Sequence, residues 1–215
     1  MTLKLYEYWR SSAAYRLRIA LNLKNVPYES VAINLHPDHR EHLSPAYQAL
    51  NPQMRVPAIE VEGEVIGQSM AILEWLDETW PDRARLLPED PILRLKARAF
   101  AQTIASDVHP LNNPVVLSKL KQDYAATPDQ VATWYRDWIE KGFAALEARY
   151  GQTSETRFLF GDAPSLAEIC LIPQIYNARR FEVPLTEFPR LVEIDALCQS
   201  LPAFAAAAPE QVKPD

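Results

Sequence analysis

The chain has 215 residues, of which 48% are hydrophobic and 10% aromatic. This composition can fill a sizeable core in one large domain or two small ones, and it excludes an intrinsically disordered protein. The formal net charge is −6, from 22 Lys and Arg residues against 28 Asp and Glu residues. It leaves no overall basic surface for a phosphate backbone, so we expect no nucleic-acid partner.

Cysteine usage and hydropathy indicate the compartment. Cys170 and Cys198 form no disulfide framework and fit a reducing cytoplasm. Charged residues occur within the first ten positions, and no stretch approaches 18 uninterrupted apolar residues. We therefore expect no targeting segment and no membrane segment.

A strand–helix–strand unit is expected at the start of the chain. Residues 3–8 have a strand-like pattern, and apolar residues recur at helical spacing over 13–21. Arg16 and Arg18 are expected on the opposite, polar side of that helix. Residues 28–33 read as a second strand, which a right-handed crossover makes parallel to the first.

A short helix, a hairpin and a longer helix are expected next. Residues 37–51 are polar and predict a short, loosely held helix. Gly63 lies between two apolar segments, where it can supply the positive φ of a tight hairpin turn. Ser69 precedes an apolar-periodic segment that ends near residue 80, so it is expected to be a helix N-cap.

The second part of the chain shows only helical patterns. We expect helices at residues 91–108, 128–150, 165–176 and 188–200. The Pro- and acid-containing residues 83–90 are expected to link a first domain, 1–82, to a second domain, 91–215.

Two local signals occur in the last third. Ser165 and Glu168 match a capping box, which predicts a helix start. The tail from Pro202 contains four consecutive alanines and then two prolines, so we expect one ordered helical turn followed by a frayed end.

Three segments of the first domain could contact a small anionic ligand. Residues 9–12 lie where the first strand meets the first helix, so backbone N–H groups and hydroxyls there would stabilise an anion or a thiolate. Pro57 at a strand start is a candidate cis proline and exposes the Val56 backbone to a peptide-like ligand. Gln68 and Ser69 offer a second helix N-terminus suited to a carboxylate. Together they predict a pocket for a peptide-like anion that carries a thiol.

Simpler structural roles compete with these assignments. A Ser-Ser pair before a helix is most often an N-cap. His109 could simply end a helix, and Arg180 could belong to a solvated pair. His36, His39 and His42 are spaced by three but have no fourth ligand nearby, so we expect no metal site.

Motifs spread over nearly the whole chain form a family signature. They are YWRSSAAYRLRIAL at residues 8–21, QALNP at 48–52, VP at 56–57, QS at 68–69, HPLNN at 109–113, and PQ and NARRF within 173–181. Together they resemble the zeta class of glutathione transferases. A match of this extent is more specific than any single motif.

The resemblance implies a glutathione transferase fold, with a thioredoxin-like α/β N-terminal domain, an all-helical C-terminal domain, a homodimer and bound glutathione. It also implies that Ser11 hydrogen-bonds the glutathione sulfur. Arg180 would receive a carboxylate of the substrate, and Arg10 would border the same cavity. The other residues implied to bind glutathione are Ser12, His42, Val56, Pro57, Gln68, Ser69, His109 and Asn113.

The activity implied by the resemblance is the glutathione-dependent isomerisation of maleylacetoacetate, a maleyl dicarboxylate, in tyrosine and phenylalanine breakdown. Zeta-class members often carry cysteine where this chain has Ala13, so chemistry that needs a protein thiol there is excluded. Addition of the glutathione thiolate to the cis double bond, rotation and elimination need no such thiol.

Three alternatives stay open. Maleylpyruvate presents the same maleyl group, and a general conjugating transferase would use the same cofactor. The third alternative is a noncatalytic glutathione-binding module. Retention of Ser11 and Arg180 argues against that module, which needs neither.

Overall fold

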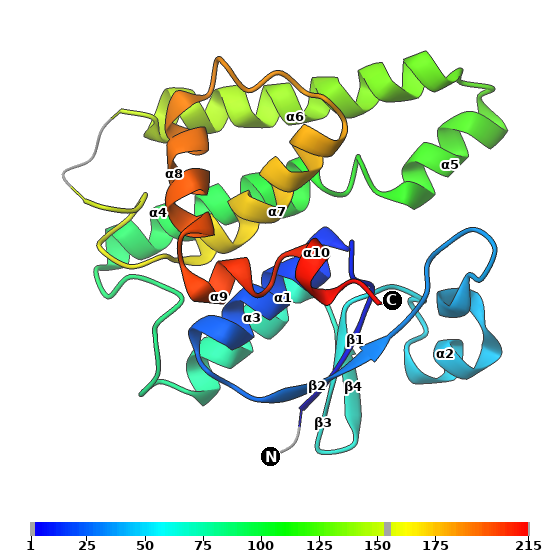
Figure 1. The fold of residues 1–215 in the computed structure, drawn as a ribbon, viewed down its shortest axis with the longest axis horizontal. Helices are drawn as coiled ribbons and strands as arrows, with labels where there is room; N and C mark the ends of the chain where they lie inside the picture. Colours follow the sequence, from blue (N-terminus) through cyan, green and yellow to red (C-terminus); the bar gives the residue numbers. More distant parts are fainter. Residues whose placement is uncertain (1–2, 153–155, 215) are drawn as a thin grey trace. The chain divides into compact units, whose positions relative to one another are not determined.

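The computed structural model describes residues 3–152 and 156–214. The chain forms two compact units. Unit 1 comprises Met1–Leu86 together with Gln199–Asp215, and unit 2 comprises Leu87–Cys198. Figure 1 shows a mixed sheet with its helices in unit 1 and a helical bundle in unit 2.

Unit 1 contains a four-stranded sheet with the order β2-β1-β3-β4. The strands are β1 (Leu3–Glu7), β2 (Tyr28–Ala32), β3 (Ala58–Val61) and β4 (Glu64–Gly67). β1 and β2 are parallel, whereas β3 is antiparallel to both β1 and β4. The predicted strand–helix–strand unit and hairpin are confirmed. Glu62 and Gly63 have φ of 52° and 86°, the left-handed values that a two-residue hairpin turn needs.

Helices cover both faces of this sheet. α1 (Ser12–Leu23) and α3 (Ser69–Thr79) pack together on one face. The 3-10 helix η1 (Glu41–Leu43) and α2 (Pro45–Leu50) provide the short helical segment expected within 37–51. Tyr47 of α2 packs against Tyr6 and Ala58 of the sheet, with the two tyrosine ring centroids 6.2 Å apart.

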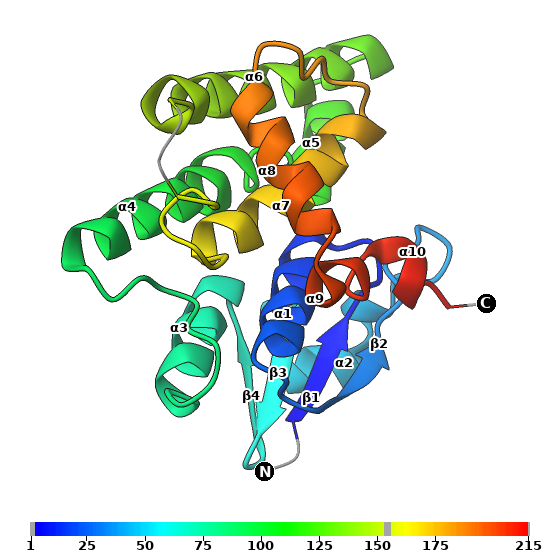
Figure 2. The same ribbon diagram turned by 60° about the vertical axis from the view of Figure 1, so that its left-hand side comes forward.

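Two expectations for unit 1 are wrong. Arg16 and Arg18 were expected on a polar side of α1, but their exposed fractions are 2% and 0%. The C-terminal tail was expected in the helical domain, whereas its contacts in the structure group it with unit 1. There α9 (Pro202–Ala205) lies beside α1 and is followed by α10 (Pro209–Val212), in place of the frayed end expected for those residues (Figure 2).

The physical reason is a set of hydrogen bonds from α1 to the tail. Arg18 Nε donates to the Ala207 carbonyl oxygen at 2.9 Å, and Asn22 Nδ2 donates to the Ala203 carbonyl oxygen at 3.0 Å. Arg18 and Asn22 therefore face the C-terminal segment, whose Phe204 is completely buried, whereas Arg16 is bonded to Ser69 of α3.

Unit 2 is helical throughout its described residues apart from connecting segments and one isolated bridge. Its elements are α4 (Pro91–Gln102), the π-helical turn η2 (Thr103–Val108), α5 (Pro114–Asp123), α6 (Pro128–Tyr150), α7 (Leu166–Arg180) and α8 (Pro189–Gln199). α5 was not predicted; it has no buried residue, so its apolar pattern is weak. α7 is the most buried helix and packs against α4.

The predicted capping box is confirmed at the start of α7. The fully buried Glu168 carboxylate accepts hydrogen bonds from the Ser165 N–H at 2.7 Å and the Leu159 N–H at 2.8 Å. Burial raises the pKa of Glu168, while these hydrogen bonds act in the opposite direction. The box joins the segment before α7 to its first turn.

Candidate active site

The three segments predicted to contact glutathione leave the sheet at one edge. Tyr6 is paired with Ala58, and Ala58 is paired with Gly67. Because these pairs are antiparallel, the end of β1, the start of β3 and the end of β4 meet at that edge. The residues next to these strand ends include Ser11, Ser12, Val56, Pro57, Gln68 and Ser69.

Ser11 is the N-cap of α1. Its Oγ accepts a hydrogen bond from the Ala14 N–H at 3.3 Å, and its own N–H donates to the Tyr8 carbonyl oxygen at 2.8 Å. A hydroxyl that accepts through a lone pair can still donate its hydrogen. Capping and donation to a thiolate are therefore compatible in Ser11. Ser12 is the first residue of α1 and is only 8% exposed, whereas Ser11 is partly exposed.

The Val56–Pro57 peptide bond is cis, as the sequence suggested. The preceding Arg55 carbonyl oxygen accepts hydrogen bonds from the Tyr47 hydroxyl and from Asn51 Nδ2, both at 2.8 Å. These bonds from α2 and its C-cap hold the segment in place. Within the described chain, the Val56 backbone makes no such bond, so it can pair with an extended peptide.

The N-cap of α3 lies one residue earlier in the chain than predicted. The N-cap is Gln68 rather than Ser69, and the Gln68 side chain makes no capping hydrogen bond. Gln68 has φ of 70°, and its Nε2 donates to Gln53 Oε1 at 3.2 Å. Ser69 is 8% exposed, and its Oγ accepts a hydrogen bond from Arg16 Nη1 at 3.4 Å. The N-terminal end of a helix carries partial positive charge, which favours a bound anion.

His42 lies in η1, partly buried. Burial lowers the pKa of His42, and the nearby Arg40 charge lowers it further. Its buried Nδ1 has no hydrogen-bond partner within the described chain. No group of three or more His, Cys, Asp or Glu side chains among the described residues could hold a metal ion.

Two cations flank Trp9 in the turn before Ser11. The Arg10 guanidinium carbon lies 5.1 Å from the Trp9 ring centroid, and Lys213 Nζ lies 5.6 Å from it. Arg10 was predicted as a site residue. Lys213 was not, because only the packing of the C-terminal segment in unit 1 brings it to this turn.

The other predicted site residues belong to unit 2. His109 ends η2, with its N–H donating to the Ile104 carbonyl oxygen at 2.9 Å. Asn113 is the N-cap of α5, and its Oδ1 accepts from the Val115 N–H at 3.0 Å. Between them, the Leu111 carbonyl accepts a hydrogen bond from α6. This hydrogen bond joins the segment to α6.

Arg180 is the last residue of α7 and is exposed. Its guanidinium carbon lies 4.7 Å from the Phe181 ring centroid, and Phe181 stacks on Tyr135 with centroids 3.7 Å apart. Burial raises the pKa of Tyr135, with the Arg180 charge acting in the opposite direction. The Arg180 side chain therefore lies against the stacked pair of Phe181 and Tyr135.

Two family models match this chain. The glutathione S-transferase N-terminal domain matches residues 1–78, and the glutathione S-transferase C-terminal domain matches residues 125–206. The chain belongs to the glutathione S-transferase family. The predicted fold class, thioredoxin-like followed by all-helical, is confirmed.

Relatives that match nearly the whole length of this glutathione S-transferase are named as isomerases. It is 46% identical to a maleylpyruvate isomerase of a Ralstonia species over 96% of its own chain and 97% of the relative. It is 45% identical to the maleylacetoacetate isomerase of Pseudomonas aeruginosa, with 96% of each chain covered.

Solved structures agree with the zeta-class resemblance. A holo maleylpyruvate isomerase, described as a bacterial zeta-class glutathione transferase, superposes with a TM-score of 0.93, 44% identity and 98% coverage of both chains. A maleylacetoacetate isomerase from Anaeromyxobacter dehalogenans, with dicarboxyethyl glutathione and citrate bound in its active site, has a TM-score of 0.85 and 40% identity, covering 99% of this chain and 93% of that one. The predicted resemblance is confirmed.

Proposed function

We propose that this glutathione S-transferase is a glutathione-dependent cis–trans isomerase that converts maleylacetoacetate to fumarylacetoacetate. The observation that carries the proposal is the meeting of the Ser11 turn, the Val56 backbone and the uncapped N-terminus of α3 at one sheet edge. That edge supplies a hydroxyl, peptide groups and an anion site, the donor set that a thiol tripeptide requires. The full-length relatives named as isomerases support the same activity.

The cysteinyl and γ-glutamyl parts of glutathione have candidate partners in unit 1. Ser11 donates its hydroxyl hydrogen to the sulfur and favours the thiolate. Val56 pairs with the cysteinyl backbone. Gln68 and Ser69, with the α3 N-terminus, hold the γ-glutamyl group. Ser12, His42 and Pro57 in unit 1, and His109 and Asn113 in unit 2, complete the proposed glutathione contacts.

The bound glutathione supplies a nucleophilic sulfur that adds reversibly to the maleyl double bond, which permits rotation before elimination. The protein stabilises charge and holds the substrate during these steps. Arg10 and Arg180 are assigned to the substrate carboxylates, since guanidinium groups bind carboxylates in bidentate geometry. Ala13 leaves the sulfur of glutathione as the only thiol that the mechanism requires.

Maleylpyruvate is the second candidate substrate, because a relative with that name is 46% identical over nearly the full length. Both substrates carry the maleyl group, so the same residues serve either reaction. Measuring kcat/KM for both compounds, and for a chloronitrobenzene acceptor, tests the proposal. Turnover of the chloronitrobenzene alone would identify a general transferase, and no turnover of any of the three would favour a noncatalytic module.

The proposal extends to the cellular setting. We place the enzyme in the cytoplasm as a homodimer acting in tyrosine and phenylalanine catabolism. None of the described helices is long and apolar enough to cross a membrane. Sedimentation analysis tests the dimer. A neighbouring gene for a fumarylacetoacetate hydrolase would support maleylacetoacetate as substrate, whereas one for a gentisate dioxygenase would support maleylpyruvate.

A further inference from the structure

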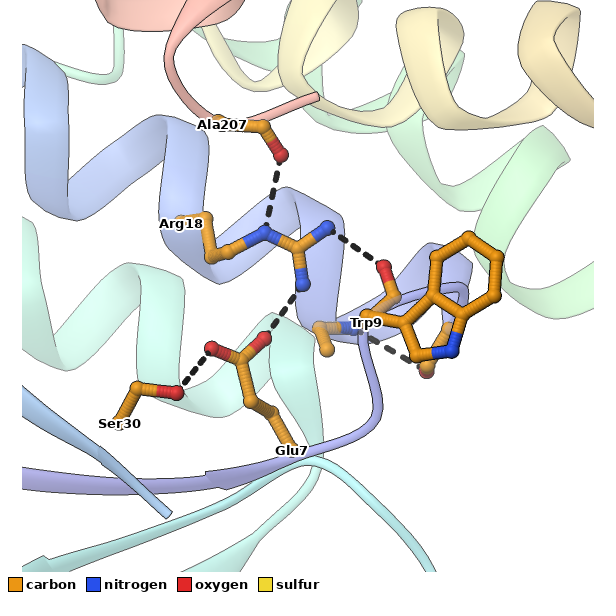
Figure 3. Close-up of polar contacts among 7 residues, drawn as sticks. Glu7, Trp9, Arg18, Ser30 and Ala207 are labelled. Atoms are coloured by element: carbon orange, nitrogen blue, oxygen red, sulfur yellow. Dashed lines mark hydrogen bonds and ion pairs between the residues drawn. The ribbon is translucent and has the colours of Figure 1, made fainter. Parts of the chain in front are cut away.

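α1 carries two buried arginines whose surroundings differ. Arg18 is fully paired: it forms an ion pair with Glu7 and donates from Nη2 to the Trp9 carbonyl oxygen at 3.0 Å (Figure 3). Its Nε donates to the Ala207 carbonyl oxygen. Every nitrogen of this guanidinium has an acceptor, as expected for a buried cation.

Arg16 lacks this compensation. It is 2% exposed, and its Nη1 donates to Ser69 Oγ at 3.4 Å. Its Nε and Nη2 are buried and have no hydrogen-bond partner in the part of the chain that the structure describes, where no carboxylate forms an ion pair with it. A buried cation without an anion is costly, and a ligand anion bound near it would offset part of this cost through space.

The position of Arg16 indicates which anion this is. Ser69 is the first residue of α3, whose N-terminus carries partial positive charge and no side-chain cap. A guanidinium next to a helix N-terminus places two positive groups together. An anion bound there would compensate both.

We propose that Arg16 is a positioning residue of the glutathione site that acts through Ser69 on the γ-glutamyl α-carboxylate. Because Ser69 Oγ accepts from Arg16, its hydroxyl hydrogen is directed away from Arg16 and can be donated to the carboxylate. The buried guanidinium does not touch the ligand; it orients Ser69 and adds positive charge beneath the site. This inference rests on the proposed use of glutathione.

The test compares two peptides in one set of variants. Calorimetry measures the Kd of glutathione and of 4-aminobutyryl-cysteinylglycine, which has hydrogen in place of the α-carboxylate. In Arg16→Met and Arg16→Gln we expect glutathione to bind about tenfold more weakly, the scale of one charge-assisted hydrogen bond. The Kd of the carboxylate-free peptide should change by less than about threefold. In turnover assays, KM for glutathione should rise while kcat at saturation changes little.

Arg18→Lys is the matched control, because it alters a buried guanidinium of the same helix that is not bonded to Ser69. It should change the affinity for both peptides by the same factor. An equal loss of affinity for both peptides in the Arg16 variants would overturn the proposal and show that the role of Arg16 is structural only. Unchanged binding of both would remove Arg16 from the site while glutathione use stands. Wild-type protein that binds neither peptide would instead contradict the proposed function.

Discussion

The Arg18 guanidinium donates to the carbonyl oxygen of Trp9, two residues before the N-cap serine of α1. The same side chain is bonded to Glu7 at the end of β1 and to Ala207 in the C-terminal segment. One buried cation therefore holds the strand, the turn and the tail together. The conformation of the turn that presents Ser11 depends on residues nearly 200 positions away in the sequence.

Removing the Glu7 carboxylate should destabilise unit 1 strongly. Glu7→Leu leaves Arg18 buried without its counter-ion, for which we expect a loss of roughly 3–5 kcal/mol in the free energy of unfolding. Ser30→Ala is the control, since it deletes only the 2.8 Å hydrogen bond to Glu7 Oε1, worth about 1 kcal/mol. Urea denaturation measures both. A similar small loss of unfolding free energy in both variants would show that the ion pair between Glu7 and Arg18 contributes little to stability.

The C-terminal segment should be required for the stability of unit 1. Phe204 is fully buried in α9, so Phe204→Ala should cost about 3–5 kcal/mol. A fragment of residues 1–86 should unfold more readily than the same fragment joined by a linker to residues 199–215. Circular dichroism melting curves compare the two fragments. Equal midpoints would contradict the assignment of the tail to this unit.

Ser11→Ala should raise the pKa of the bound glutathione thiol, because the proposed donor to the thiolate is lost. The nucleophilic fraction at neutral pH then falls, and kcat should decrease by about ten- to a thousandfold. Thiolate absorbance of the bound peptide, followed as a function of pH, measures the shift. Ser12→Ala should leave that pKa in place, and Ala13→Cys should leave turnover within a few fold. A pKa rise in Ser12→Ala alone would reverse the assignment of the two serines.

Gln68→Ala should weaken glutathione binding more than it slows turnover at saturation. The proposed γ-glutamyl contact lies away from the reacting sulfur and is similar in the ground and transition states. Initial rates over a range of glutathione concentrations separate KM from kcat. Gln53→Ala removes only the hydrogen bond to Gln68 and should change both constants less. An unaltered KM in Gln68→Ala would remove this residue from the site.

Arg180→Ala should raise KM for the maleyl substrate and lower kcat/KM, while glutathione affinity stays nearly the same. Arg179→Ala is the neighbouring control. Arg179 pairs with the buried Asp195, so its loss should lower the melting temperature without affecting the substrate KM. Steady-state kinetics and thermal melting distinguish the two arginines. Wild-type kinetics in Arg180→Ala would exclude it as a carboxylate receptor.

Local patterns in the sequence were sufficient for much of the fold. The hairpin at Gly63 and the capping box of Ser165 and Glu168 depend on residues within a few positions of one another. Helix α6 has the predicted bounds because its cap and its apolar period are both local. Proximity of Ser11, Val56 and Gln68 also follows from the strand order, once the strands are assigned.

Tertiary structure alone decided which polar residues are buried. Arg16 and Arg18 are charged residues that interrupt the apolar pattern of α1, yet α3 and the C-terminal segment provide acceptors for them. Sequence periodicity reports where apolar side chains lie, but it cannot show that a distant carbonyl or hydroxyl will cover a charge. The energy of a buried guanidinium depends on the partners that folding brings to it, and those partners come from segments far apart in the chain.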